Sequence, residues 1–136
     1  MKIKMKKIVG TITIIGVIVS SSMAGVYAAA RTAYFSNRTV TPSYSETITG
    51  ITVQNAGKHS MVMRINSVSS AGTFYITMPQ RRADGTYGGG AGINVKVGTL
   101  STAAPLSLQL NSGSHHLKLT GGSGINMVTK YLEASF

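Results

Sequence analysis

The sequence predicts an all-β fold, a mainly antiparallel β-sandwich of about seven short strands that follows a cleaved N-terminal signal peptide. Apolar and polar residues alternate with a period of two through most of the chain after residue 43. Clusters of Gly, Ser, Asn and Pro interrupt this alternation at short intervals, as turns do between strands. No stretch carries a helical period long enough for a crossover helix. A flattened β-barrel is the alternative architecture.

Residues 1–30 form the predicted secretory signal peptide. Four lysines precede an uncharged apolar run, residues 8–19, and small residues follow it. The run has the length of a signal-peptide core and is shorter than the roughly 20 residues that span a bilayer. We expect cleavage after Ala30, with Ala28 as the second choice, and an uncleaved anchor as the alternative. The lysine-rich start is typical of Gram-positive leaders, and it predicts a secreted, extracellular protein.

The mature chain, residues 31–136, is predicted to be a single β-sandwich domain. Cysteine is absent from the sequence. Disulfides, thiol catalysis, cysteine-ligated zinc and a lipoprotein anchor are therefore excluded. Without the four leader lysines, nine basic residues oppose three acidic ones, which leaves a formal charge of +6. This cationic balance favours anionic partners.

The first strands are predicted from residue 31 onward. Residues 31–40 are predicted to form an edge strand or a mobile N-terminal arm, because Pro42 stops regular pairing. Residues 44–53 alternate cleanly and predict the next strand. Residues 60–68 and 73–78 then predict a hairpin, with Met and Ile on one side of the first strand and Phe, Ile and Met on one side of the second.

Residues 79–92 predict the longest exposed and most mobile loop of the domain. The segment contains Pro79, an Asp-Gly pair and a Gly-rich end. These residues favour turns and leave the backbone few restraints. Arg81, Arg82 and Tyr87 are the candidate binding residues, forming a tip that would contact an anionic surface. The alternative is a solvated loop with no binding role.

Four more strands complete the predicted domain, at residues 93–97, 106–110, 115–120 and 125–134. Short turns separate them, which predicts a meander of hairpins. Pro105 stands at a tolerated position, the opening of its strand. The last segment also fits a helical face, but its Ile, Val, Thr and Tyr residues favour a strand.

The sequence offers little for catalysis, and we predict a protein that is not an enzyme and has no catalytic residues. Glu46, Asp84 and Glu133 are the carboxylates of the mature chain and each stands alone in sequence. No nucleophile elbow or phosphate-binding motif is present. His115 and His116 are expected to point to opposite faces of a strand, which disfavours a metal ion ligated by both; a site that joins His59 to one of them is the alternative. We predict no metal or cofactor, with His115 buried and His116 facing water.

The predicted function is non-enzymatic binding to an anionic cell-envelope surface or to another protein. Cell-envelope polymers, anionic lipid head groups and acidic polysaccharides are the anions that an exported protein meets. Nucleic acid is not expected as a partner, since the basic residues are dispersed along the chain. No transmembrane span is expected after cleavage of the leader.

Leader and composition together resemble those of cysteine-free, β-rich secreted bacteriocins such as the lactococcin 972 family. This resemblance implies a bacteriocin-like, antimicrobial role. The alternative function is that of an extracellular structural or self-assembling protein. It would form homo-oligomers through exposed strand edges such as residues 33–35 or 125–136.

Overall fold

The structure, a computed structural model, describes residues 17–18 and 31–136. The predicted signal peptide lies outside the described residues except for Val17–Ile18, which forms β1. None of the described residues forms a helix long and apolar enough to cross a membrane.

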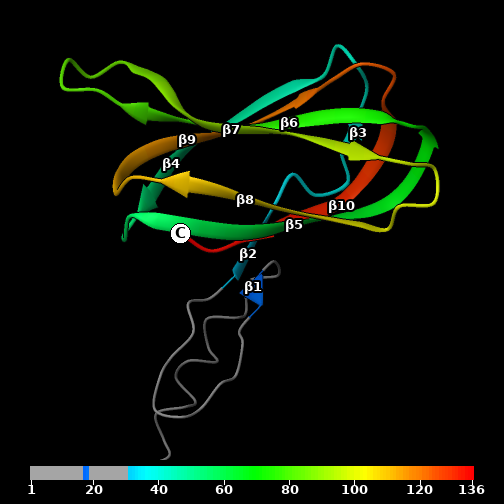
Figure 1. Cartoon of the computed structure of the whole chain (residues 1–136), viewed down its shortest axis with the longest axis horizontal. Helices are drawn as coiled ribbons and strands as arrows, with labels where there is room; N and C mark the ends of the chain where they lie inside the picture. The colour runs from blue at the N-terminus through cyan, green and yellow to red at the C-terminus, as the bar shows by residue number, and fades with distance from the viewer. Residues whose placement is uncertain (1–16, 19–30) are drawn as a thin grey trace, which may run out of the picture.

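The described residues form two antiparallel sheets that stack as a sandwich (Figure 1). Sheet A has the strand order β1-β2-β10-β5-β8, with β3 also paired to β10, and sheet B has the order β4-β9-β6-β7. The predicted all-β, mainly antiparallel sandwich is confirmed. After β1, the strands are β2 (Arg31–Tyr34), β3 (Thr39–Val40), β4 (Ser45–Val53), β5 (Gly57–Ser70), β6 (Gly72–Arg81), β7 (Tyr87–Val97), β8 (Ala103–Leu110), β9 (Gly113–Gly121) and β10 (Asn126–Ala134).

The strand pairs β6–β7, β5–β8, β4–β9 and β3–β10 are nested around the β6–β7 hairpin. Nested pairing divided between two sheets is the jelly-roll topology. Each of the seven predicted strands overlaps one of β4 to β10, including the last segment. The predicted meander is wrong, because consecutive strands from β4 to β10 lie in opposite sheets, except for β6 and β7.

The predicted hairpin of residues 60–68 and 73–78 is also wrong. β5 pairs with β8 and β10 in sheet A, whereas β6 pairs with β7 and β9 in sheet B. Only Ala71 separates the two strands, which is too short for a two-residue hairpin turn. The chain instead crosses between the sheets at Gly72. A Cβ atom there would lie 2.3 Å from the carbonyl oxygen of Ser123.

The side chains that this pattern placed on the apolar sides are nevertheless buried. Phe74, Ile76 and Met78 of β6 are fully buried, and so are Met61 and Met63 of β5. The two sets face each other across the sandwich instead of lying side by side in one sheet. Methionine suits this interface because its flexible side chain fills irregular gaps between sheets.

Residues 31–40 lie toward the β1 end of sheet A, but β2 is flanked by β1 and β10, so the edge-strand interpretation is not confirmed for residues 31–34. β2 and β3 both pair with β10. Between them, Phe35 and Asn37 adopt positive φ angles of 55° and 54°. The buried Thr129 hydroxyl donates a hydrogen bond to the Phe35 carbonyl oxygen (2.6 Å) and accepts one from the Arg38 backbone N–H (2.9 Å). These two bonds fix the turn against β10.

The expected open edge at residues 125–136 is not found, since β10 is flanked by β5 on one side and by β2 and β3 on the other.

The edge strand of sheet A beside β5 is β8. The Ile65 N–H donates to the Thr102 carbonyl oxygen, so odd-numbered β5 residues occupy the hydrogen-bonded pairs. Pro105 is opposite Val62, an even-numbered β5 residue, so these two residues form a non-hydrogen-bonded pair. Its nitrogen therefore points to the free edge, where a missing N–H discourages strand addition.

Replacing Pro105 with threonine is expected to leave the domain folded and to increase concentration-dependent self-association. The substitution restores an N–H donor at the free edge of β8 and breaks no ladder bond. Stability should change by no more than about 0.5 kcal/mol, as for most surface substitutions. Sedimentation velocity over a concentration series measures the association, with Ser107→Thr as the matched control on the same strand. If Pro105→Thr stays monomeric wherever the parent does, Pro105 is not an edge-protecting residue.

Candidate functional site

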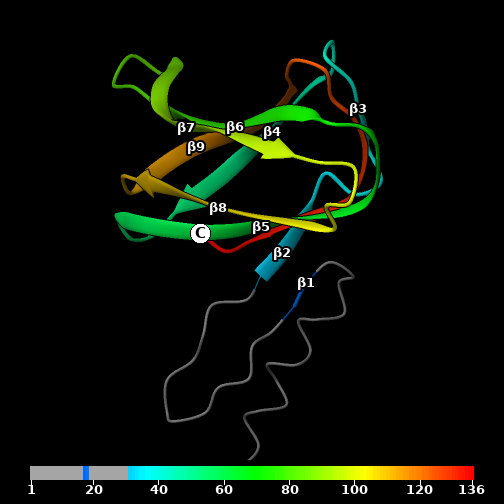
Figure 2. The same ribbon diagram turned by 45° about the vertical axis from the view of Figure 1, so that its right-hand side comes forward.

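The predicted mobile loop at residues 79–92 is mostly strand, which corrects the sequence interpretation. β6 continues to Arg81 and β7 begins at Tyr87, and the two pair down to the Arg81–Tyr87 position. Only residues 82–86 form the turn. We call residues 80–88 the hairpin arm; it projects from one end of sheet B (Figure 1). Figure 2 shows that the arm rises on the side of sheet B that faces away from sheet A.

The turn of the hairpin arm is closed by its own hydrogen bonds. The Arg82 N–H donates to the Thr86 carbonyl oxygen (2.7 Å) and the Gly85 N–H to the Arg82 carbonyl oxygen (2.9 Å). The Asp84 carboxylate accepts from the backbone N–H and the hydroxyl of Thr86 (2.9 and 2.7 Å). These two bonds lower the pKa of Asp84 below its ordinary value. Hydrogen bonds within residues 82–86 thus hold the turn at the end of the arm, which contains Arg82 and Asp84.

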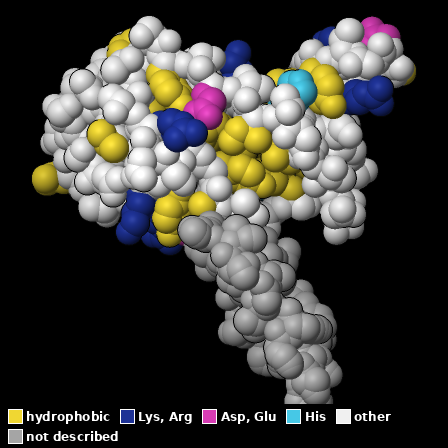
Figure 3. Space-filling model, turned by 180° about the vertical axis from the view of Figure 1, so that it is seen from behind, with side chains coloured by type: hydrophobic (Ala, Val, Ile, Leu, Met, Phe, Trp, Pro, Cys, Tyr) yellow, Lys and Arg dark blue, Asp and Glu magenta, His cyan; other side chains and the backbone are white. Residues whose placement is uncertain are grey.

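Tyr87 is occupied by a contact within the protein. Its ring stacks on the His116 ring of β9, with centroids 3.6 Å apart and planes tilted by 14°. His115 is buried, as predicted, but His116 is half-buried and its Nδ1 atom is buried without a hydrogen-bond partner. In Figure 3 a histidine side chain lies at the foot of the arm, with acidic and basic side chains near the arm's end. Of the three predicted binding residues, Tyr87 therefore fixes the arm, whereas Arg81 is exposed beside it.

The outer face of sheet B, the face turned away from sheet A, presents aligned polar side chains from four strands. One row runs Ser45, Thr120, Tyr75, Asn94 across β4, β9, β6 and β7. The next row runs Thr47, Lys118, Thr77, Gly92. Thr73 and Lys96 form a third, shorter row on β6 and β7. Neighbouring strands lie about 4.8 Å apart, so these rows form a continuous open platform.

Tyr75 is the exposed aromatic residue of this platform. The residue is 44% exposed, although it stands between the fully buried Phe74 and Ile76. Lys118 and Lys96 are its diagonal neighbours on β9 and β7. Sequence reasoning missed all three residues. The period-two alternation could have shown that Tyr75 faces outward, but no local signal shows which strands flank it.

Carboxylates are absent from the outward positions of these four strands. In the described residues Glu46 bonds to Arg38 (2.7 Å), and Glu133 contacts Arg64 (2.8 Å) and Arg31 (3.8 Å). Glu46 is opposite Leu119, a core residue, so its strand position faces inward. The hydrogen bond from Arg38 lowers the pKa of Glu46. The lysines of the platform have no carboxylate partner within the described part of the chain.

The Glu46 carboxylate also accepts a hydrogen bond from the Tyr44 hydroxyl. Burial, followed by this bond, raises the pKa of Tyr44 to about 12. Arg38 and Tyr44 thus hold the carboxylate in place by hydrogen bonds from two sides. Residues 17–18 and 31–136 contain no group of three or more His, Asp or Glu side chains that could hold a metal ion.

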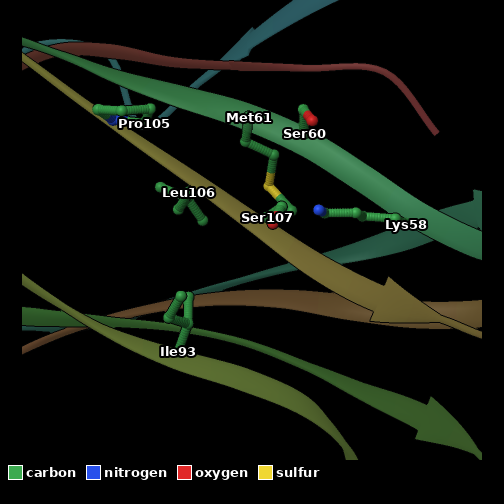
Figure 4. Close-up of a pocket in the computed structure, with 7 residues that line it drawn as sticks. All are labelled: Lys58, Ser60, Met61, Ile93, Pro105, Leu106 and Ser107. Carbon is green, nitrogen blue, oxygen red and sulfur yellow. The ribbon is translucent and has the colours of Figure 1, made fainter.

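A shallow groove lined by residues of β5 and β8 in sheet A and of β7 in sheet B is the second surface feature (Figure 4). Its volume is about 440 Å³, and it has one charged side chain and no aromatic ring. Such a lining offers few groups that would orient a ligand. The platform of sheet B is therefore the better candidate. The groove is lined by Lys58, Ser60, Met61, Ile93, Pro105, Leu106 and Ser107.

No model of a known protein family matches the chain, and a search of curated proteins finds no similar sequence. Several solved structures are similar in fold. CsCBM6-3 from Clostridium stercorarium, in complex with cellobiose, is 16% identical with a TM-score of 0.44, over 88% of this chain and 82% of that chain. The carbohydrate binding module CBM6cm-2 of Cellvibrio mixtus lichenase 5A, in complex with cellotriose, is 13% identical with a TM-score of 0.42, over 89% of this chain and 87% of that one.

The isomalto-dextranase of Arthrobacter globiformis, complexed with panose, is 14% identical with a TM-score of 0.48 over 89% of this chain. The present chain spans only 19% of that enzyme. These similarities concern the β-sandwich fold alone.

Proposed function

We propose that this chain is a secreted, non-enzymatic protein that binds a polysaccharide of the cell envelope through the outer face of sheet B. The observation that carries the proposal is the exposed Tyr75 ring, set among outward hydroxyl and amide side chains. A sugar ring has an apolar C–H face that packs on an aromatic ring. Its hydroxyl rim exchanges hydrogen bonds with groups such as Thr77 and Asn94, which both donate and accept.

The shape of the platform supports a polymer as the ligand. Four strands contribute to an open surface, and small ligands are usually enclosed in concave pockets instead. The hairpin arm stands at one end of this surface, with the exposed Arg81 on the strand position opposite Tyr87. Arg81 and Arg82 would then add contacts at the end of the bound polymer. In this arrangement Tyr87 acts indirectly, by holding the arm on His116.

The charge distribution supports an anionic envelope polymer as the target. Lys96 and Lys118 of the platform and Arg81 and Arg82 of the arm have no carboxylate ion pair in the described residues. The absence of outward carboxylates also favours binding over catalysis on this face, since glycoside hydrolysis uses a carboxylate pair. A bacteriocin-like role rests on leader and composition, and no described side chain adds to it.

Tyr75→Ala is expected to weaken binding of the protein to purified bacterial cell walls at least about tenfold. Central exposed tyrosines are typical binding hot spots, and a tenfold loss corresponds to about 1.4 kcal/mol. Co-sedimentation with walls at increasing protein concentration gives the apparent affinity. Tyr75→Phe keeps the ring and should retain most of the binding.

Tyr131→Ala on β10 of sheet A is the matched control and should bind as the parent does. Anionic liposomes test the lipid alternative in the same assay. Failure of the parent protein to pellet with walls, or equal pelleting of Tyr75→Ala, would refute the proposed function.

A further inference from the structure

We infer that the polysaccharide bound by sheet B is linear and acidic, and that it crosses the sheet along the line Lys118–Tyr75–Lys96. The inference rests on the proposed function and adds the chemical class and the direction of the ligand. The ring of one sugar would pack on Tyr75, and acidic groups on sugars to either side would meet the two lysine ammonium groups.

Strand register places these three residues on one diagonal. Tyr75 of β6 is directly opposite Thr120 of β9 and Asn94 of β7. Lys118 lies two residues before Thr120, and Lys96 lies two residues after Asn94. Both pairings are antiparallel, so Lys118 is opposite Thr77 and Lys96 is opposite Thr73. The two lysines therefore lie on either side of β6, one displaced toward Thr77 and the other toward Thr73. The tyrosine is therefore the centre of a line that crosses three strands.

The length of this line calls for a ligand of several sugars. Diagonal neighbours on a sheet lie about 7–8 Å apart, so the two lysine positions are separated by about 15 Å at most. A monosaccharide packed on the Tyr75 ring covers only the middle of this line. A linear chain running along the diagonal reaches all three side chains.

Charge complementarity selects an acidic polymer over a neutral one. No carboxylate lies beside either lysine in its row: Thr47 and Thr77 flank Lys118, and Thr73 is opposite Lys96. The three carboxylates of the described residues are bonded elsewhere, to Arg38, to Arg64 and Arg31, and to Thr86. Two ammonium groups on a face without carboxylates favour a chain that brings its own negative charges.

The test uses the full chain and two pairs of polysaccharides that share a backbone and differ in charge. Polygalacturonate is compared with its fully methyl-esterified form, and carboxymethyl-cellulose with cellulose. We expect tighter binding to the acidic member of a pair, and a 2- to 30-fold loss for the Lys96→Gln, Lys118→Gln double variant, the range for two exposed ion pairs. Binding of the parent should weaken with salt, and binding of the double variant much less.

The Lys58→Gln, Lys130→Gln variant removes the same charge from strands of sheet A and should bind as the parent does. Equal binding to both members of each pair, or equal losses in the two double variants, would overturn the acidic-ligand inference. If wall binding still depends on Tyr75 in that case, the proposed function stands with a neutral polysaccharide as its ligand. Binding of anionic vesicles but of none of the four polysaccharides would overturn the inference in favour of a lipid surface.

Discussion

Phe74→Ala is expected to lower the free energy of unfolding by about 3–5 kcal/mol, the cost of truncating a buried aromatic side chain. Phe74 is fully buried on β6, opposite Val95 of β7 and Gly121 of β9. The sheets on both sides of its ring are held by their own hydrogen-bond ladders. The site therefore cannot collapse to fill the space left by the ring. The expected loss is a large part of the 5–15 kcal/mol that stabilises a typical domain.

Urea or guanidinium denaturation followed by tyrosine fluorescence or circular dichroism measures this loss. Phe74→Leu is the matched control, because it keeps most of the side-chain volume and should cost less than about 1.5 kcal/mol. A cost for Phe74→Ala no larger than that of Phe74→Leu would contradict the central position of Phe74 in the core.

Side-chain alternation was sufficient to predict the strands, because it records which side of each strand meets the core. The sets around Met61 and Phe74 are buried as the pattern indicated. Alternation does not record which sheet a strand joins. Facing strands of a sandwich and paired strands of a hairpin both bury alternate residues, so β5 and β6 looked like a hairpin. The jelly-roll order depends on pairings between residues far apart in sequence, such as Ser45 with Thr120.

Glycine content misled the interpretation of the hairpin arm. Glycine is unfavourable in strands, and the Gly-rich end of residues 79–92 therefore indicated a loop. In the structure β7 runs through this segment beside β6. Gly90 has a φ of 77°, and a Cβ atom there would lie 2.1 Å from the Met78 carbonyl oxygen. Glycine at this position permits β7 to pass close to β6 where their register shifts, between Met78 and Gln80.

The candidate site could not be predicted from the sequence because, like the strand order, it depends on pairings between residues far apart in sequence. Tyr75, Lys96 and Lys118 belong to three strands, and 21 and 22 residues separate their sequence positions. Each faces outward by alternation, but their diagonal arrangement appears only when the registers of β6 with β7 and β9 are known. Arg81 and Arg82 were noticeable because they are adjacent in sequence, which says nothing about the rows on sheet B.

Gly121→Ala is expected to destabilise the domain by about 1–3 kcal/mol, as overpacking of a well-packed interior does. Gly121 is buried at the end of β9, and its N–H donates to the Tyr44 carbonyl oxygen (2.9 Å). A Cβ atom there would lie 1.7 Å from the carbonyl oxygen of Thr41 and 3.3 Å from a methyl carbon of Val40. The first of these is a backbone atom in the turn before β4. The turn must shift as a whole to admit the methyl group, because no side-chain rotation relieves the contact.

Gly98→Ala is the matched control for this prediction. No atom lies within 4 Å of a Cβ at Gly98, and its φ is not in the left-handed region. Alanine there fits the folded chain and restricts the unfolded one, so it should be neutral or stabilising by up to about 1 kcal/mol. Thermal unfolding should therefore separate the two variants, since 1 kcal/mol shifts the Tm of a domain near this size by about 4–8 °C. Equal Tm values for Gly121→Ala and Gly98→Ala would show that the turn before β4 does not pack against the end of β9 as closely as described.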